Sequence, residues 1–498
     1  MEAHQPFFHQ HVPKNALLIL LSLLCLPISG LLTLVAILHN YHHDNQKSSK
    51  NIRNDNVGSK TILVTGVSMT KGLVIARLLG KHTHHHIIAA DLEPVPFTSP
   101  GRYCRFISEF TRLNVSRNCG TDEYTENLLK LMMKKKVDLW ISCSSVVNAV
   151  EDGRVMKLAK KAMGPGFRAM QFDEDVVTKL HEKDALMDYL ADIGCLVPES
   201  YRCTSADEVE KVINVSSGND KDHNREAKSF ILKPVGVDDK ARAQMMTLLP
   251  FPGDKKNDLK AYLSSLNISA SRPFLLQQHI QGYEYCTHSL VIDGKVKAFV
   301  SCPSSDLLMH YEALPQESVL NKKMLQFTQH VAEQEGSGFS GHLSFDFIAQ
   351  GKGEKIQIYP IECNPRAHTA VVLFNDTPAM AAQYLTCFDA GQQASQDIIF
   401  PRKSTTNTYW IGHDLVALAL APCLTLLCQE ENITEVLKAL KTFWDHLLYW
   451  HDGTFDSTDP LPFLVLYHIY WPTQFFKCLL TGQKWSRINV STTKIFEI

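Results

Sequence analysis

The residue types best suited to chemistry gather in one stretch, residues 341–370, which contains two acids, an amide and a guanidinium: Asp346, Glu362, Asn364 and Arg366. Carboxylate and amide oxygens suit Mg²⁺, which keeps some of its waters and completes its shell with nucleotide phosphates. A guanidinium two residues after the amide would lie beside the same phosphates and pair with them. The stretch therefore predicts a site for Mg²⁺, or for Mn²⁺, beside a bound nucleotide.

Two predicted strands hold these side chains. Residues 343–348 alternate in polarity, residues 355–362 alternate again, and a Gly-Lys-Gly turn lies between them. Because every second side chain of a strand points to the same face, Glu362 and Asn364 are expected on one side. The alternative is a hairpin whose polar face meets only water, but acids flanked by apolar residues at the centre of a strand are unusual.

The composition describes a folded protein of several domains. A chain of 498 residues has room for roughly three domains of ordinary size. A hydrophobic content of 45% with 20% charged residues is typical of globular chains, and a net charge of −2 gives no reason to expect a nucleic acid partner. The 13 cysteines are dispersed, which favours free thiols in a reducing compartment over a disulfide framework.

An apolar segment lies near the N-terminus. Residues 16–38 contain no charge and are long enough to cross a bilayer once, although Pro27 and Gly30 could kink the segment or make it re-enter. More basic residues follow the segment than precede it, which favours the cytoplasmic side for the rest of the chain. We therefore expect residues 1–59 to be a membrane anchor, a transmembrane helix with a polar linker. The alternatives are a buried hydrophobic hairpin and a targeting segment.

Residues 60–178 are expected to form a small doubly wound α/β domain. A buried strand at 61–65, a helix at 71–79 and a second strand at 87–90 make a βαβ unit. Its turn resembles a dinucleotide-binding fingerprint, and Asp91 follows where an acid would bind a ribose. The spacing is not G-x-G-x-x-G, however, and the Tyr-x-x-x-Lys pair of the short-chain reductases is missing, so a dehydrogenase is the weaker interpretation.

The segment that follows carries further candidates for nucleotide binding. Lys183 lies on a helix predicted at 176–193 and Lys233 near the end of a strand predicted at 228–234, and two lysines can reach phosphate oxygens as point charges. The apolar strand at 273–280 could offer backbone groups to the edge of an adenine, and Glu284 could accept from ribose hydroxyls.

The order of these residues resembles that of the ATP-grasp ligases, in which two α+β subdomains clamp ATP. The resemblance implies a pre-ATP-grasp domain at 60–178, an ATP-grasp domain at 179–390 and a helical C-terminal extension at 391–498. It also implies ATP and Mg²⁺ as cofactors. For ATP, the resemblance implies that Lys183 and Lys233 bind the phosphates, that Gln277 and the backbone of Gln278 and Ile280 contact adenine, and that Glu284 binds the ribose. Asp346, Glu362 and Asn364 would bind Mg²⁺, and Arg366 would contact the transferred phosphoryl group. Where many members have a Gly/Ser-rich phosphate loop, this chain has Arg242, our candidate to replace those donors.

Within that superfamily the chain is most similar to the mycosporine-glycine synthetase family, through Cys286-Thr-His-Ser, the ECNPRAHTA stretch and a late DPLPFL. This resemblance implies that ATP activates the enol oxygen of 4-deoxygadusol and that glycine then displaces phosphate, giving mycosporine-glycine, ADP and phosphate. Arg242 or Arg366 would hold the glycine carboxylate. His288 and His368 are either substrate contacts and bases or structural histidines, and contact with upstream enzymes of the pathway stays open.

Two other functions stay open. One is an ATP-grasp ligase that activates a carboxylate as an acyl phosphate and joins it to an amine. The other is a membrane-tethered nucleotide-binding protein without enzymatic activity, which the complete set of acids, amide and arginine argues against. In the C-terminal extension, the aromatic residues 463–480 could lie on a membrane, cap the active site or pack against the ATP-binding domain.

Overall fold

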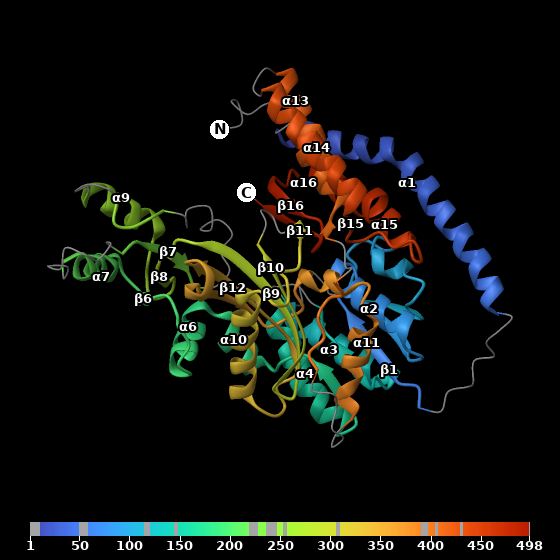
Figure 1. Cartoon of the computed structure of the whole chain (residues 1–498), viewed down its shortest axis with the longest axis horizontal. Coiled ribbons are helices and arrows are strands. Elements are labelled where there is room, and N and C mark those ends of the chain that lie inside the picture. Colours follow the sequence, from blue (N-terminus) through green and yellow to red (C-terminus); the bar gives the residue numbers. More distant parts are fainter. Residues whose placement is uncertain are drawn as a thin grey trace.

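The computed structural model describes residues 10–48, 58–113, 120–143, 148–218, 228–235, 247–251, 256–304, 309–389, 397–403, 407–428 and 432–497. Figure 1 shows these segments as a mixed α/β body with one long N-terminal helix at its side. Arg242, the candidate for covering the terminal phosphate, lies outside the described residues.

The first layer is a parallel sheet of five strands in the order β3-β2-β1-β4-β5. Its strands and helices are β1 (Thr61–Thr65), α2 (Thr70–His82), β2 (His86–Leu92), β3 (Glu109–Leu113), α3 (Gly120–Lys135), β4 (Leu139–Ile141), α4 (Ala149–Met163) and β5 (Arg168–Met170). Ile62 and Val64 pack with α2 on one face, whereas Leu63 packs with α3 and α4 on the other. Helices therefore cover both faces, as in a doubly wound sheet.

Two short helices and a small antiparallel sheet come next. They are α5 (Glu174–His181), α6 (Lys183–Asp192), and the strands β6 (Ser200–Cys203), β7 (Phe230–Pro234) and β8 (Phe274–Gln278) in the order β6-β8-β7, flanked by α7 (Ala206–Gly218) and α9 (Lys256–Leu266). The prediction of one helix over 176–193 is wrong. Glu182 has an extended backbone, with φ −75° and ψ 124°, so the helix breaks there and α6 starts afresh at Lys183.

A second antiparallel sheet has the order β10-β9-β12-β13. Its strands are β9 (Tyr283–Ile292), β10 (Lys295–Pro303), β12 (Gly341–Gln350) and β13 (Gln357–Asn364), and α10 (Val319–Glu335) packs on one face. The buried rings of Phe345 and Phe347 meet Phe327 of α10, each at a centroid distance of 5.1 Å. Since side chains alternate along β12, this packing forces Asp346 to the opposite face.

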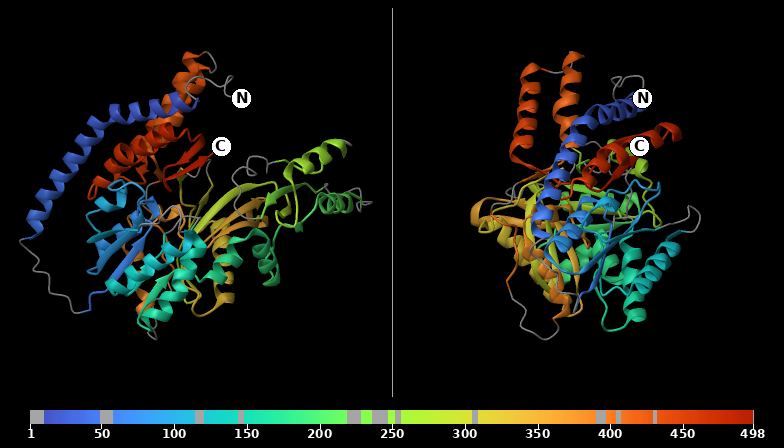
Figure 2. Two further views of the ribbon diagram at one scale, coloured as in Figure 1. Left: turned by 180° about the vertical axis from the view of Figure 1, so that it is seen from behind. Right: turned by 90° about the vertical axis from the view of Figure 1, so that its right-hand side faces the viewer.

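The C-terminal part is largely helical and returns to the first layer. It contains η7 (Thr369–Phe374), α11 (Pro378–Leu385), α12 (Ile411–Asp414), the π-helix η9 (Leu415–Leu420), α13 (Ala421–Leu427), α14 (Ile433–Tyr449), α15 (Leu461–Val465), η10 (Leu466–Tyr470), α16 (Trp471–Thr481) and the hairpin of β16 (Trp485–Asn489) and β17 (Lys494–Glu497). The short strands β11 (His310–Tyr311), β14 (Thr408–Tyr409) and β15 (His451–Asp452) form a sheet in the order β11-β14-β15. Figure 2 shows α13 and α14 rising from the body as a pair. The predicted fold class, α/β and α+β sheets with a helical C-terminal part, is confirmed.

Helix α1 (His11–Ser48) contains the apolar N-terminal segment. Among the described residues it is the one helix long and apolar enough to cross a membrane, although a signal sequence near an N-terminus has the same properties. It lies along the C-terminal part: Lys14 donates to the carbonyl of Trp485 at 2.6 Å, and Ser22 donates to that of Tyr467 at 2.9 Å. Near its other end Asn40 donates to the carbonyl of Ser457 at 2.7 Å.

Candidate active site

The strand pair β12–β13 brings the predicted acids, amide and guanidinium together. Asp346 lies directly opposite Glu362 in the antiparallel ladder, and Ser344 lies opposite Asn364. Asn364 Nδ2 donates to Asp346 Oδ2 at 3.2 Å, and Arg366 Nη2 donates to Asn364 Oδ1 at 2.8 Å. The amide of Asn364 therefore orients both the acid and the arginine.

The acidic side chains on this face of β12–β13 repel one another, and a bound cation would stabilise them. Burial raises the pKa of Asp346 well above its ordinary value, and the nearby carboxylates of Glu362 and Glu284 raise it further. The Arg366 guanidinium and the hydrogen bond from Asn364 oppose this shift only in part. A divalent ion would relieve the repulsion between the acids, and two carboxylates with an amide oxygen are hard donors of the kind that Mg²⁺ and Mn²⁺ bind. The residues present therefore fit the predicted metal.

The two predicted phosphate lysines come from separate elements and reach the same region. Lys233 lies near the end of β7, and Lys183 is the first residue of α6. Burial lowers the pKa of Lys233 to about 8, the carboxylates of Glu362 and Glu284 oppose this shift, and the charge of Lys183 adds to it. The lysines, Glu362 and Glu284 thus lie close enough to influence one another.

The residues predicted to meet adenine are engaged within the small sheet. Gln277 is buried, accepts from Lys233 Nζ at 2.7 Å and donates from Nε2 to Ser200 Oγ at 3.1 Å. The backbone N–H of Gln278 donates to the carbonyl of Glu199 at 2.7 Å. In this arrangement the side chain of Gln277 positions Lys233, the lysine that is predicted to bind phosphate. Ile280, which is 8% exposed, is the second residue after β8.

His181 lies near Glu362 and Arg366 and was not identified from the sequence. Burial lowers its pKa, while Glu362 opposes this shift and Arg366 reinforces it. Its Nδ1 is buried and has no hydrogen-bond partner among the described residues. It stands at the end of α5, just before the break that starts α6, so its closeness to Lys183 in sequence is the signal that could have revealed it.

The two predicted histidines lie deeper, in a buried cluster. His288 Nδ1 accepts from the backbone N–H of His368 at 3.3 Å, and His368 Nδ1 accepts from the N–H of Ala370 at 3.2 Å, which caps η7. Burial lowers the pKa of His368 to about 3 and that of His288 well below its ordinary value. Groups this weakly basic are poor acceptors for the proton of an ammonium. The role of the two histidines as substrate contacts or bases stays a prediction.

Lys71 is a second residue that the sequence analysis missed. It lies in the first turn of α2, is 1% exposed, and its Nζ donates to the carbonyl of Ala367 at 2.9 Å, directly after Arg366. Burial lowers its pKa well below the ordinary value, and the charge of Arg366 lowers it further. Its local sequence is that of an ordinary surface lysine on a helix, so the sequence carries no signal for its burial.

The first βα turn is closed by the chain itself. The backbone N–H of Thr70, at the start of α2, donates to the carbonyl of Ser491 at 2.9 Å, and Trp410 Nε1 donates to Thr70 Oγ1 at 3.2 Å. Asp91 accepts from the backbone N–H of Ser68 at 2.6 Å. The position where a dinucleotide-binding domain would hold a pyrophosphate is thus occupied by the C-terminal part, which argues against a dehydrogenase.

No protein-family model matches the sequence, and no curated protein matches it. Among solved structures, the chain is similar to an N5-carboxyaminoimidazole synthase from Aspergillus clavatus in complex with ADP and an aminoimidazole ribonucleotide, at 13% identity and TM-score 0.48, covering 73% of this chain and 87% of that one. It is also similar to a biotin carboxylase from Campylobacter jejuni, at 12% identity and TM-score 0.49, covering 68% and 72%. A phosphoribosylamine–glycine ligase from Thermotoga maritima matches at 12% identity and TM-score 0.46, covering 70% and 78%.

Proposed function

We propose that this chain is an ATP-grasp ligase that forms a carbon–nitrogen bond and releases ADP and phosphate. The observation that carries the proposal is the face of β12–β13, where Asp346, Glu362 and Asn364 meet Arg366 within reach of Lys233. A metal site beside a partly buried lysine and an arginine suits the positioning and charge neutralisation that phosphoryl transfer requires.

Each residue then has a role that follows from its surroundings. Asp346, Glu362 and Asn364 would hold Mg²⁺, which when bound neutralises phosphate charge and orients the phosphates. Lys233, held by Gln277, and Lys183 would neutralise the remaining phosphate oxygens. Arg366, fixed by Asn364 on one side, would face the transferred group.

The reaction class that suits this site is activation of an acid oxygen. The terminal phosphoryl group moves from ATP to an oxygen of the acceptor, which releases ADP and creates a good leaving group. The amine nitrogen then attacks the adjacent carbon, the carbon–oxygen bond breaks, phosphate leaves and the nitrogen loses its proton. A carboxylate activated in this way is an acyl phosphate, and this is the function we place first.

The second candidate is narrower: 4-deoxygadusol as the acceptor and glycine as the amine. A vinylogous acid undergoes the same two steps at its enol oxygen. The specific observation in its favour is the sequence resemblance, which extends into the late DPLPFL stretch. Asp459 at the start of that stretch is buried in an ion pair with Arg77 of α2, so the matching tail is an integral part of the fold.

An assay of purified protein separates the two candidates. Protein, ATP and Mg²⁺ are incubated with 4-deoxygadusol and glycine, or with panels of carboxylic acids and amino acids, while ADP release and the product mass are followed. If only the pair of 4-deoxygadusol and glycine stimulates ADP release and yields product, the narrower function is supported. If a carboxylate–amine pair does so, the carboxylate–amine ligase is supported. Failure of every pair to stimulate ADP release would contradict a ligase of either kind and favour a nucleotide-binding protein.

We also propose attachment to a membrane with the catalytic part on the cytoplasmic side, where ATP is available. Along α1 the large apolar side chains Leu24, Ile28 and Leu31 are 66%, 67% and 62% exposed. Because Lys14 and Asn40, near opposite ends of the helix, both contact the C-terminal part, α1 in this position would lie in one leaflet instead of crossing the bilayer. Vesicle flotation of the full chain and of a chain without residues 11–42 tests this: loss of flotation on deletion is expected, and unchanged flotation would contradict it.

A further inference from the structure

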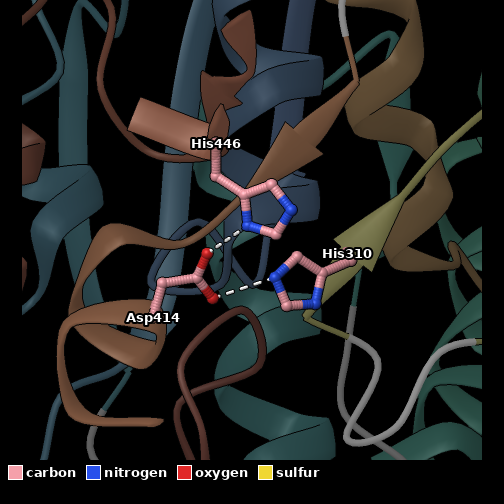
Figure 3. Close-up of side chains that lie close together, drawn as sticks. All are labelled: His310, Asp414 and His446. Carbon is pink, nitrogen blue, oxygen red and sulfur yellow. Dashed lines mark hydrogen bonds and ion pairs between the residues drawn. The ribbon is translucent and has the colours of Figure 1, made fainter. Parts of the chain in front are cut away.

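Two histidines and one aspartate from distant parts of the chain converge away from the nucleotide site. His310 lies on β11, Asp414 ends α12 and His446 lies on α14 (Figure 3). Asp414 Oδ1 is 2.9 Å from His310 Nε2, and Asp414 Oδ2 is 2.6 Å from His446 Nδ1. Within the part of the chain that the structure describes, no other group of three His, Cys, Asp or Glu side chains places its ligand atoms within 4.8 Å of one another.

The burial of the group is graded in a way that suits a bound ion. The Asp414 side chain is 0% exposed, whereas those of His446 and His310 are 12% and 22% exposed. A carboxylate removed from water requires a positive partner or several donors, and Asp414 pairs with both of these imidazoles. The partly exposed histidines leave one side of the group in contact with solvent, where a water ligand could enter.

The donor set is selective in its chemistry. Two imidazole nitrogens and one carboxylate oxygen are the protein ligands of many zinc sites with an open fourth position, and the same set also binds Fe²⁺. Hard ions such as Mg²⁺ prefer oxygen ligands and bind imidazole nitrogen weakly. Ligand atoms at ~2.0–2.2 Å from a tetrahedral ion lie roughly 3.4 Å apart, so the two nitrogen–oxygen contacts of 2.9 and 2.6 Å would both lengthen when an ion binds.

We propose that His310, Asp414 and His446 bind a divalent transition-metal ion of the zinc class. The ion would join β11 to both arms of the helical pair, η9–α13 and α14, and so fix that pair on the sheet β11-β14-β15. The ring of Trp450, 4.3 Å from that of His446 between centroids, covers one side of the group. The site does not depend on the proposed ligase function.

The test uses the full chain. Protein is stripped with 1,10-phenanthroline in excess Mg²⁺, so that the nucleotide site keeps its own ion, and is then titrated with Zn²⁺, with Co²⁺, and with Fe²⁺ under anaerobic conditions. We expect one ion per chain by elemental analysis, a tetrahedral Co²⁺ absorption spectrum, and a lower unfolding temperature after stripping that Zn²⁺ restores. His446→Asn and Asp414→Asn should weaken binding at least about tenfold, since even the loss of an outer-shell partner costs that much.

A matched control separates this site from adventitious binding by exposed histidines. The variant His82→Gln/His84→Gln/His86→Gln removes three exposed imidazoles from the His-rich stretch of the first domain, and it should bind one ion as the unaltered chain does. Binding of Fe²⁺ in preference to Zn²⁺ would support the site with a different ion. If stripping leaves the unfolding temperature of the unaltered chain unchanged and no ion is retained, the group is a hydrogen-bonded His–Asp–His contact and the proposal is overturned, even where a variant fails to fold.

Discussion

The strand pair β12–β13 and the contact between α2 and the C-terminal part are built in opposite ways. On the strand pair, Asp346 and Asn364 are separated by 18 residues, and the alternation of side chains along the paired strands brings them to one face. Arg366 follows two residues after the end of β13, where Asn364 holds it. At α2, Arg77 pairs with Asp459, 382 residues further along the chain. We refer to this second region, formed by Thr70, Lys71 and Arg77 with their C-terminal partners, as the α2 seam.

The comparison teaches where sequence analysis succeeds. A period of two residues is a local property, so the strand pair could be predicted with its acids on the correct face. The α2 seam depends on which distant segment folds back, and no local pattern encodes that. The strand pair should govern catalysis with little effect on stability, whereas the seam should govern stability, and variants can test this division.

The largest effect is expected at the centre of the seam. The Arg77 side chain is 1% exposed, and its Nε lies 2.9 Å from Asp459 Oδ2. Arg77→Ala leaves a buried carboxylate without its partner, which should lower the free energy of unfolding by about 3–5 kcal/mol. Chemical denaturation followed by fluorescence measures the change.

Two comparisons control the Arg77 prediction. Lys60→Ala removes the ion pair with Asp138, whose side chains are 40% and 32% exposed, and should cost less than about 1 kcal/mol. The double variant Arg77→Met/Asp459→Leu should regain most of the lost stability, because it removes both buried charges. If Lys60→Ala lowers the free energy of unfolding as much as Arg77→Ala does, burial does not determine how much these ion pairs contribute to stability.

The next effect is expected on the strand pair. Glu362→Gln keeps the size of the side chain but removes one charge from the predicted metal site, so ADP release should fall by about 100–1,000-fold with the unfolding free energy nearly unchanged. Glu354→Gln is the matched control, since this exposed glutamate lies in the turn between the same two strands. Activity of Glu362→Gln close to that of the unaltered chain would refute the assignment of the metal site.

The residues of the candidate site were easier to predict from the sequence than the helix boundaries and the long-range contacts around it. Lys233, Asp346 and Asn364 follow from polar residues within apolar strands, and the structure brings them into one region. The break at Glu182 did not follow from the sequence, because residues 176–193 keep a helical pattern through it and only the backbone shows the extended residue. Lys71 was missed because a surface lysine on a helix has the same local sequence as a buried one, and its hydrogen-bond partner Ala367 lies 296 residues further along the chain.

A third prediction concerns the pH dependence of the strand-pair region. The pKa of Lys233 is lowered from 10.5 to about 8 in the folded chain, so the unfolded chain binds more protons between these values and stability should rise with pH from about 8 to 10.5. Lys233→Met removes the free-energy cost of keeping this lysine charged in the folded chain. In the absence of nucleotide, the variant should be more stable than the unaltered chain at pH 7, by roughly 2–3 kcal/mol, with the difference shrinking toward pH 10.5.

Denaturation at several pH values, paired with nucleotide titration, checks the Lys233 prediction. The variant should bind ATP more weakly even where it is more stable, as expected for a residue placed for function. Lys323→Met is the control, because its Nζ donates to the carbonyl of Ile356 at 2.7 Å near the protein surface, away from the acids. Lower stability of Lys233→Met at pH 7 would show that the lysine stabilises the empty fold.

The smallest effect is expected where the two regions meet. Lys71 belongs to the α2 seam, yet its Nζ donates to the carbonyl of Ala367, the residue after Arg366, and its pKa is lowered by burial and by that arginine. A bound anionic acceptor substrate would offset both effects, because a negative charge beside Lys71 and Arg366 favours the charged form of the lysine. Lys71→Met should therefore raise the KM for the acid substrate about tenfold, which corresponds to ~1.4 kcal/mol, with the KM for ATP unchanged. If the variant instead loses stability with both KM values intact, Lys71 belongs to the seam alone and the division between the two regions holds without exception.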